Sequence, residues 1–210
     1  MPNIASLGVG QSQLEDNMRI VVFDFDGTLI DSNRLKYNAY FAIFPKNIRY
    51  HRTIKSVLAD FFEATRYAII HCILERLGEA DDSGGRVSTL AQSYNDIVVA
   101  GAKTCPELPG ASDILAQLSG HYVLYLNSTT PETALREIVT HRGWTKYFRG
   151  IFGYPTTKLD TMRAILATER IEPVETILVG DGQNDRHVAA AVGCRFMHAD
   201  GRPLTELLTV

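Results

Sequence analysis

Short apolar runs alternate with longer amphipathic segments from Gly110 to the end of the chain. The runs are rich in β-branched and aromatic residues, as buried strands are, and the longer segments repeat their apolar residues at helical spacing. The expected strands cover residues 122–126, 150–152, 176–179 and 194–197, with a fifth at 20–25. The expected helices cover residues 111–118, 131–141, 159–170 and 184–192. Because parallel strands connect through right-handed crossovers, this order predicts an α/β fold of the doubly wound, Rossmann-like type.

Residues 33–104 interrupt the alternation. Apolar residues recur there at helical spacing, for example in 54–72 and 87–98, and no segment resembles a strand. We therefore expect an inserted, all-helical domain at 33–104 between two parts of the α/β core, 19–32 and 105–210. Residues 1–18 mix Gly, Ser, Gln and acidic residues without periodicity, so we expect a flexible leader there.

The composition excludes several classes of protein. The chain of 210 residues has a formal net charge of −3, which gives no general attraction to nucleic acid or to anionic membranes. No apolar run approaches the roughly 20 residues of a membrane span. Cys72, Cys105 and Cys194 lie far apart without a CxxC pair, so neither a disulfide framework nor a zinc site is indicated. This cysteine usage suits a reducing cytoplasm.

The pattern DFDGTL begins at Asp24, at the end of the first expected strand. In open α/β sheets, ligands bind at the carboxyl ends of the strands. Asp24 and Asp26 start on the same face of an extended segment, and each raises the pKa of the other unless a cation lies nearby. The alternative without function is an Asp-Gly turn after a strand. However, D-x-D-G-T arises by chance in only about one 200-residue chain in 400, which favours a site.

A second acidic motif, GDGQND, runs from Gly180 to Asp185 after another expected strand. Alone it is weak, because Asp or Asn at a strand-to-helix junction is often only a helix N-cap. Its position at the same edge of the sheet places Asp181 and Asp185 with the carboxylates of the first motif. Clustered carboxylates need a counter-ion, and such oxygen ligands suit Mg²⁺ rather than zinc.

Two further positions lie at the same expected edge. Ser128 and Thr129 follow a strand and precede a helix, so a hydroxyl and the first helix N–H groups can receive an anion. A plain Ser/Thr N-cap is the alternative. Lys158 ends the stretch GYPTTK after the next strand, and only this context separates it from an ordinary solvated lysine.

In this order and spacing, the motifs resemble those of the haloacid dehalogenase superfamily, from residue 19 to the end. DFDGTL corresponds to the first motif, Ser128 to the second, Lys158 to the third and GDGQND to the fourth. The insert at 33–104 resembles the helical cap of this superfamily in architecture, although not in sequence. An acid at Asp26 implies a phosphatase or phosphotransferase, because dehalogenases of the superfamily lack it.

The resemblance also implies roles for the first carboxylates and the metal ligands. Asp24 would be the nucleophile that forms an aspartyl-phosphate, and Asp26 the general acid and base. Mg²⁺ would be held by the Asp24 carboxylate, the Asp26 backbone carbonyl and Asp181, with Asp185 binding the ion or its waters.

The remaining motifs would bind the phosphoryl group. Ser128, with Thr129 beside it, and Lys158 would hold the phosphoryl oxygens, and Lys158 would also stabilise the charge of Asp24. Asn184 would add a phosphate contact.

We therefore expect a Mg²⁺-dependent phosphatase that acts on a small phosphorylated metabolite, most similar to the phosphoglycolate phosphatase branch. Two alternatives remain open. One is a phosphomutase resembling β-phosphoglucomutase, which uses the same catalytic residues, and the other is a non-catalytic module that binds a phosphorylated ligand or a protein. The substrate and the oligomeric state do not follow from the sequence.

The insert contains a basic stretch, PKNIRYHRTIK, at residues 45–55. Its cations, Lys46, Arg49, Arg52 and Lys55, would either recognise an acidic substrate group over the core or simply face water. The solvated surface is the stronger expectation, because most charge clusters on protein surfaces contribute little.

Overall fold

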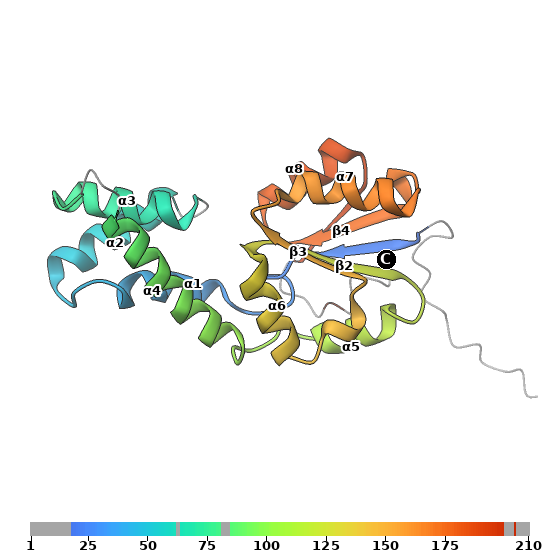
Figure 1. Cartoon of the computed structure of the whole chain (residues 1–210), viewed down its shortest axis with the longest axis horizontal. Coiled ribbons are helices and arrows are strands. Elements are labelled where there is room, and N and C mark those ends of the chain that lie inside the picture. Colours follow the sequence, from blue (N-terminus) through green and yellow to red (C-terminus); the bar gives the residue numbers. More distant parts are fainter. Residues whose placement is uncertain (1–17, 62–63, 81–84, 200–203, 205–210) are drawn as a thin grey trace, which may run out of the picture.

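The computed structural model describes residues 18–61, 64–80, 85–199 and 204. These residues form two parts that lie side by side, an α/β core and a unit made only of helices (Figure 1). The carboxyl ends of the strands point toward the helical unit, so the edge of the sheet that the motifs occupy faces it.

The core sheet is parallel in all its pairings. Its strand order is β3-β2-β1-β4-β5. The strands are β1 (Ile20–Phe23), β2 (Val123–Pro131), β3 (Gly150–Tyr154), β4 (Thr176–Gly180) and β5 (Arg195–His198). This topology confirms the predicted doubly wound α/β fold. β1 is the central strand, and its four residues are therefore buried.

Helices cover both faces of the sheet. They are α5 (Ala111–Leu118) and α6 (Glu132–His141) on one face, and α7 (Lys158–Glu169) and α8 (Gln183–Val192) on the other. Alternate residues of β1 separate the two layers: Val21 and Phe23 pack with α5 and α6, whereas Ile20 and Val22 pack with α7 and α8. Short 3₁₀ turns, Thr145–Tyr147 and Pro173–Glu175, precede β3 and β4.

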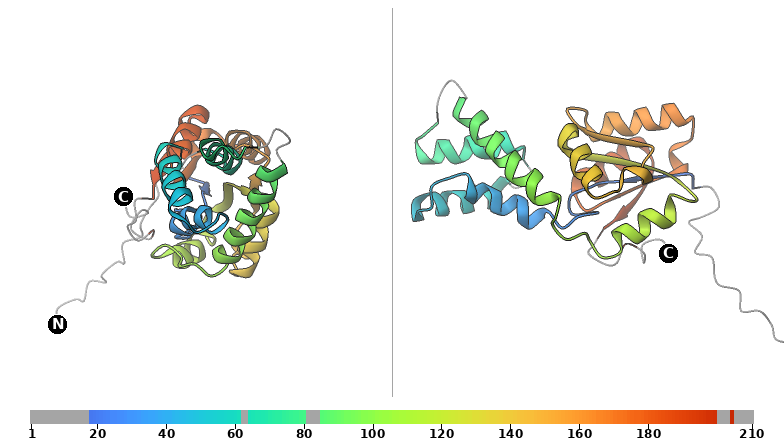
Figure 2. Two further views of the ribbon diagram at one scale, coloured as in Figure 1. Left: turned by 90° about the vertical axis from the view of Figure 1, so that its left-hand side faces the viewer. Right: turned by 60° about the horizontal axis from the view of Figure 1, so that its bottom comes forward.

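The helical unit, which we call the cap, consists of α1 (Asn33–Ala42), α2 (Ile48–Phe61), α3 (Arg66–Leu77) and α4 (Gly85–Ala102). It buries a hydrophobic cluster of its own, with members from each of these helices, such as Tyr40, Val57, Ile73 and Tyr94. Figure 2 shows the cap helices grouped at one end of the core. The first and last cap helices, α1 and α4, pack against each other and connect the cap to the core.

Several predicted boundaries were wrong by a few residues. β1 ends at Phe23 rather than at residue 25, and β2 extends to Pro131, so that Pro131 is the N-cap residue of α6 instead of its first-turn residue. Lys158 is the first residue of α7 and does not belong to the preceding loop. The apolar pattern of residues 54–72 spans two helices, and Thr65 caps the second by accepting a hydrogen bond from the Ala68 N–H.

The predicted leader falls almost entirely outside the described residues, which begin at residue 18. Met18 itself is 8% exposed and packs in the core cluster, so this last residue of the expected leader belongs to the fold. In the described ranges, no helix combines the length and the apolarity that crossing a membrane requires.

Candidate active site

The first motif leaves the sheet in a tight turn. Gly27 has a φ of +76°, a conformation that favours glycine, and its N–H donates to the carbonyl of Ile30 over 2.9 Å. The N–H groups of Leu29 and Ile30 both reach back to the carbonyl of Phe25. The turn places Asp24 and Asp26 at the carboxyl edge of the central strand, where both are buried.

Lys158 joins the first motif to the fourth. Its Nζ lies 2.7 Å from Asp24 Oδ1 and 2.6 Å from Asp185 Oδ1. Burial lowers the pKa of Lys158, but the charges of Asp24 and Asp185 outweigh this effect and raise the pKa above its ordinary value. Burial raises the pKa of Asp24, against the opposing charge of Lys158. The ammonium therefore stays charged and holds two buried carboxylates in place.

The fold fixes Lys158 through its backbone as well as its charge. Asn127, near the end of β2, donates from Nδ2 to the Lys158 carbonyl over 2.9 Å. Thr157 caps α7 by accepting a hydrogen bond from the Asp160 N–H over 3.1 Å. The helix therefore begins at Lys158 itself, and its side chain is directed to the sheet edge.

Asp181 completes an acidic cluster. Asp24, Asp181 and Asp185 each offer a carboxylate oxygen, and these atoms all lie within 4.8 Å of one another. Burial, followed by the negative charge of Asp24, raises the pKa of Asp181. Asn33 donates to Asp181 Oδ2 over 3.3 Å, and the His198 ring lies 3.1 Å from the Asp181 carbonyl.

This donor set fits the predicted Mg²⁺. Lys158 binds Oδ1 of Asp24 and Oδ1 of Asp185, and the Gly182 N–H donates to Asp185 Oδ2 over 3.3 Å, while each of the three carboxylates offers one oxygen to the cluster. Carboxylate oxygens, together with water and substrate phosphate oxygens, are ligands that suit Mg²⁺. A divalent cation there would also relieve the repulsion that raises the pKa of Asp181.

The Asp26 side chain belongs to a separate network. Oδ1 accepts from Ser32 Oγ over 2.6 Å, and Oδ2 accepts from Thr130 Oγ1 and from Lys36 Nζ, each over 2.7 Å. Burial raises the pKa of Asp26, but the Lys36 ammonium outweighs it, with help from these hydrogen bonds, so the pKa lies below its ordinary value. The two carboxylates of the first motif thus have opposite electrostatic environments.

The predicted phosphate ligands lie in different surroundings. Ser128 is buried, and its Oγ accepts from the Thr130 N–H over 3.1 Å. Thr129 is exposed at the end of β2, and Asn184 is exposed in the first turn of α8. The structure therefore brings Asp24, Asp26, Ser128, Lys158, Asp181 and Asp185 to one edge of the sheet, and within the described residues it shows no hydrogen bond from the side chains of Thr129 and Asn184.

The sequence interpretation missed five polar side chains of the site, namely Ser32, Asn33, Lys36, Asn127 and Thr130. Asn127 and Thr130 interrupt an otherwise apolar strand at its carboxyl end, and this signal could have found them. Ser32 and Asn33 follow the first motif closely. Lys36 has no local signal, because its contact to Asp26 depends on how α1 leaves the core.

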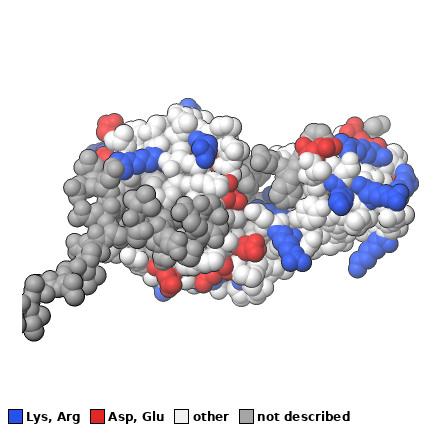
Figure 3. Space-filling view, turned by 180° about the vertical axis from the view of Figure 1, so that it is seen from behind, with Lys and Arg blue, Asp and Glu red and all other residues white. Residues whose placement is uncertain are grey.

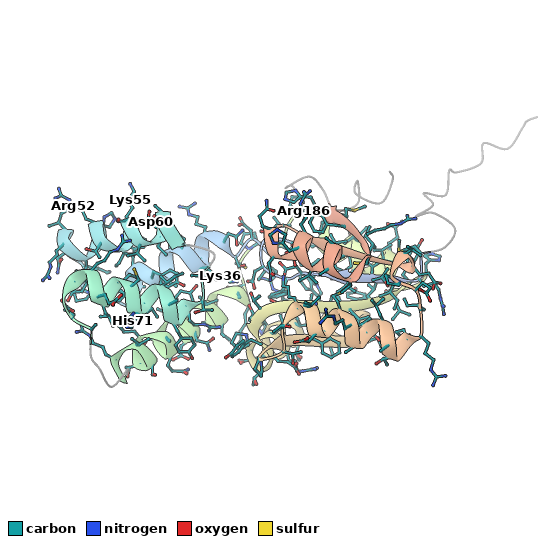
Figure 4. The ribbon with its side chains drawn as sticks, turned by 90° about the horizontal axis from the view of Figure 1, so that it is seen from above. Lys36, Arg52, Lys55, Asp60, His71 and Arg186 are labelled. Atoms are coloured by element: carbon teal, nitrogen blue, oxygen red, sulfur yellow. The ribbon has the colours of Figure 1, made fainter. Side chains whose placement is uncertain are left out.

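The basic stretch 45–55 does not reach this site. The Arg49 guanidinium donates to the carbonyl of Leu77 at the end of α3. Arg52 and Lys55 are exposed and lie on the part of the cap away from the core, whereas Lys36 lies next to the core (Figure 4). Figure 3 shows Lys and Arg side chains gathered toward this outer end of the cap. The stretch is therefore solvated surface in this structure, as the stronger expectation had it.

Comparison with known proteins shows which family this sequence matches. The sequence matches the haloacid dehalogenase-like hydrolases over residues 21–199. It is 27% identical over 200 residues to phosphoglycolate phosphatase 1 of Pseudomonas aeruginosa, covering 90% of this chain and 73% of that protein.

Solved structures with the same fold include two proposed enzymes. A proposed phosphoglycolate phosphatase of Haemophilus somnus has a TM-score of 0.69 at 17% identity, covering 87% of this chain and 85% of that chain. A proposed β-phosphoglucomutase of Thermotoga maritima has a TM-score of 0.66 at 21% identity, covering 92% and 93%. The family match and the curated relative confirm the prediction of a hydrolase of the phosphatase type. The chain therefore belongs to the haloacid dehalogenase-like hydrolase family, as the order of its motifs predicts.

Proposed function

We propose that this protein is a Mg²⁺-dependent phosphatase that hydrolyses a small phosphorylated metabolite through an aspartyl-phosphate on Asp24. The observation that carries the proposal is the Lys158 ammonium, which lies 2.7 Å from Asp24 and 2.6 Å from Asp185 in buried surroundings. This contact holds Asp24 at the sheet edge within a cluster of carboxylates that could hold a metal ion. The phosphoglycolate phosphatase relative supports a small phosphomonoester as the substrate.

In the first step, a carboxylate oxygen of Asp24 attacks phosphorus, and the bond from phosphorus to the ester oxygen breaks. The leaving oxygen takes a proton from Asp26. In the second step, a water attacks phosphorus, the bond from phosphorus to Asp24 breaks, and Asp26 takes the water's proton. Phosphate and an alcohol leave, and both carboxyl groups return to their starting states.

The surroundings of the two carboxylates differ, as do the roles proposed for them. The contacts of Asp26 to Ser32 and Thr130 hold it apart from the Asp24 cluster, so it can face the leaving oxygen while Asp24 faces phosphorus. Its lowered pKa favours the carboxylate, which is the form that activates water in the second step, whereas the first step needs the protonated form and therefore works against this shift.

The other residues hold the phosphoryl group and the cation. Ser128, with Thr129 and Asn184 farther out, would contact phosphoryl oxygens together with the Lys158 ammonium. Asp24, Asp181 and Asp185, with the backbone carbonyl of Asp26, would hold Mg²⁺. The ion supplies positive charge that offsets the repulsion between Asp24 and a dianionic phosphate.

The test is phosphate release from a panel of phosphorylated metabolites and from p-nitrophenyl phosphate, with Mg²⁺ and with EDTA. We expect hydrolysis that requires the divalent ion and disappears in the Asp24→Asn variant. Undiminished hydrolysis in EDTA would exclude the metal assignment, and hydrolysis by Asp24→Asn would exclude the nucleophile.

The same panel separates the alternatives. A phosphomutase would convert a sugar phosphate into its isomer without stoichiometric phosphate release. A module that only binds would retain phosphorylated ligands and release no phosphate from any of them.

A further inference from the structure

The third carboxylate of the acidic cluster, Asp181, is held differently from the other two. Among the described residues, the Lys158 ammonium donates to Asp24 and to Asp185 but not to Asp181. The side chain that donates to the Asp181 carboxylate is instead Asn33, from Nδ2 to Oδ2 over 3.3 Å. The orientation of this carboxylate therefore depends on a neutral amide and not on the buried ammonium.

The first motif leaves room for this contact. A Cβ at Gly27 would lie 2.0 Å from Asp181 Oδ2 and 2.7 Å from Asn33 Nδ2, so the glycine lies directly beside the hydrogen bond. His198 contacts the backbone carbonyl of Asp181 over 3.1 Å. Both the side chain and the main chain of Asp181 thus have partners outside the fourth motif.

Helix capping does not account for Asn33. The N-cap residue of α1 is Ser32, and its hydroxyl donates to Asp26 instead of capping the helix. Asn33 is the first helical residue, a position outside the N-cap, where the preference for asparagine lies. Asparagine also has a low helix propensity. Its contact with Asp181 is therefore the interaction that explains an asparagine here.

Asn33 is also the first residue of the cap. Just before it, the two chain segments that connect core and cap pair through their backbones. The Asp31 N–H donates to the Pro106 carbonyl over 2.9 Å, and the Leu108 N–H donates to the Leu29 carbonyl over 3.0 Å. Asn33 follows this paired region by two residues, so its amide connects the start of α1 directly to the acidic cluster of the core.

A separate set of contacts fixes the other end of the cap. Arg142, which follows α6, donates from Nη2 to the Ala102 carbonyl over 2.7 Å and to the Cys105 carbonyl over 2.6 Å. Lys103 Nζ lies 2.6 Å from Glu137 Oε1 of α6. Because the end of α4 is tied to α6 in this way, a change in the angle between cap and core would alter the contacts that α1 makes with the site. A hydrogen bond of 3.3 Å is already long, so it is sensitive to such a change.

We infer that Asn33 is a positioning residue for Mg²⁺ binding, whose amide orients the Asp181 carboxylate and links the affinity of the core for the ion to the position of α1. The inference rests on the proposed function, because it takes Asp181 to be a metal ligand. Groups that hydrogen-bond a metal ligand orient it and tune its affinity for the ion. By linkage, if the Asn33 contact strengthens Mg²⁺ binding, Mg²⁺ must strengthen the Asn33 contact by the same factor.

The first test measures Mg²⁺ binding without substrate, so it does not depend on turnover. Wild type and Asn33→Ala are titrated calorimetrically with Mg²⁺. Asn38→Ala is the matched control, because Asn38 is an exposed asparagine of the same helix. We expect Asn33→Ala to raise the dissociation constant roughly tenfold, the lower end of the effect of losing the partner of a metal ligand. The Asn38→Ala variant should bind the ion as wild type does.

Unfolding in EDTA separates positioning from support of the fold. Alanine has a higher helix propensity than asparagine, so α1 should not become less stable in Asn33→Ala. We therefore expect its Tm in EDTA to stay close to that of wild type, whereas its increase in Tm with added Mg²⁺ should be smaller. A lower Tm in EDTA together with an unchanged dissociation constant for Mg²⁺ would show a purely structural role and overturn the inference.

Hydrogen exchange tests the link to the cap. We expect Mg²⁺ to slow amide exchange at the start of α1 in wild type and in Asn38→Ala, but not in Asn33→Ala. Exchange in α1 that does not respond to Mg²⁺ in wild type, or that responds equally in Asn33→Ala, would contradict the link.

The titration also distinguishes failure of the inference from failure of the proposed function. A wild type that binds no Mg²⁺ would refute the metal site itself, and the inference with it. Equal dissociation constants for wild type and Asn33→Ala would leave the metal site in place and overturn only the role of Asn33.

Discussion

Gly27 lies against the Asp181 carboxylate so closely that position 27 has no room for a side chain. A Cβ at Gly27 would lie 2.0 Å from Asp181 Oδ2, and Gly27 also has a φ of +76°. The Gly27→Ala variant should therefore displace Asp181 and raise the Mg²⁺ concentration needed for half-maximal activity by at least about tenfold, as when the support of a metal ligand is lost.

Gly78→Ala is the matched control for backbone strain. Gly78 also has a positive φ, +68°, but nothing lies within 4 Å of its Cβ position. The Gly78→Ala variant should therefore be less stable than wild type but need the same Mg²⁺ concentration for half-maximal activity. An unchanged Mg²⁺ titration in Gly27→Ala would show that Asp181 does not bind the ion.

Replacing Lys158 by Met should destabilise the protein in EDTA by roughly 3–5 kcal/mol, because it leaves buried carboxylates without their cation. Burial already raises the pKa of Asp24, and losing Lys158 removes the charge that opposes this. The folded variant then binds a proton more readily than the unfolded chain. Its loss in free energy of unfolding, relative to wild type, should therefore become smaller as the pH falls from about 8 to about 5. Urea denaturation at several pH values measures the free energy of unfolding, and Lys46→Met, which replaces an exposed lysine, is the control. A deficit independent of pH would argue against unpaired carboxylates.

Mutation of the two carboxylates of the first motif should have different effects on catalysis. Asp24→Asn should remove both turnover and the phosphoenzyme, whereas Asp26→Asn should still bind phosphate and turn over about 10²- to 10⁴-fold more slowly. Rapid-quench detection of the phosphoenzyme together with steady-state rates distinguishes the two. Near-normal turnover in either variant would refute the role given to that residue.

Mg²⁺ should stabilise the folded protein, because an ion that binds only the folded state shifts the unfolding equilibrium by mass action. The gain should be about 2.7 kcal/mol at a hundred times the dissociation constant, and Asp181→Asn should lose most of it. Differential scanning fluorimetry with increasing Mg²⁺ measures the effect without reference to activity. The same increase in Tm in wild type and Asp181→Asn would place the ion elsewhere.

The sequence predicts the core far better than it predicts the junction with the cap. Asp24, Asp181 and Lys158 each follow an apolar run, and parallel strands bring such positions to one edge without further information. The Lys36 contact depends instead on the direction in which α1 leaves the first motif, which no local pattern encodes. The basic stretch 45–55 left two interpretations open for the same reason, since charge density says nothing about which side of a helical bundle faces the core.

Ser32, Asn33 and Lys36 stand at the junction of core and cap, yet their side chains contact Asp26 and Asp181. The structural border between core and cap therefore runs through the site instead of around it. A chimaera that exchanges caps between relatives at residue 32 would import foreign partners for Asp26, and one joined after Tyr40 would keep them. A cap exchanged at residue 32 would thus change the partners of Asp26 and the substrate preference together. A cap exchanged after Tyr40 would change the substrate preference and leave the partners of Asp26 as they are.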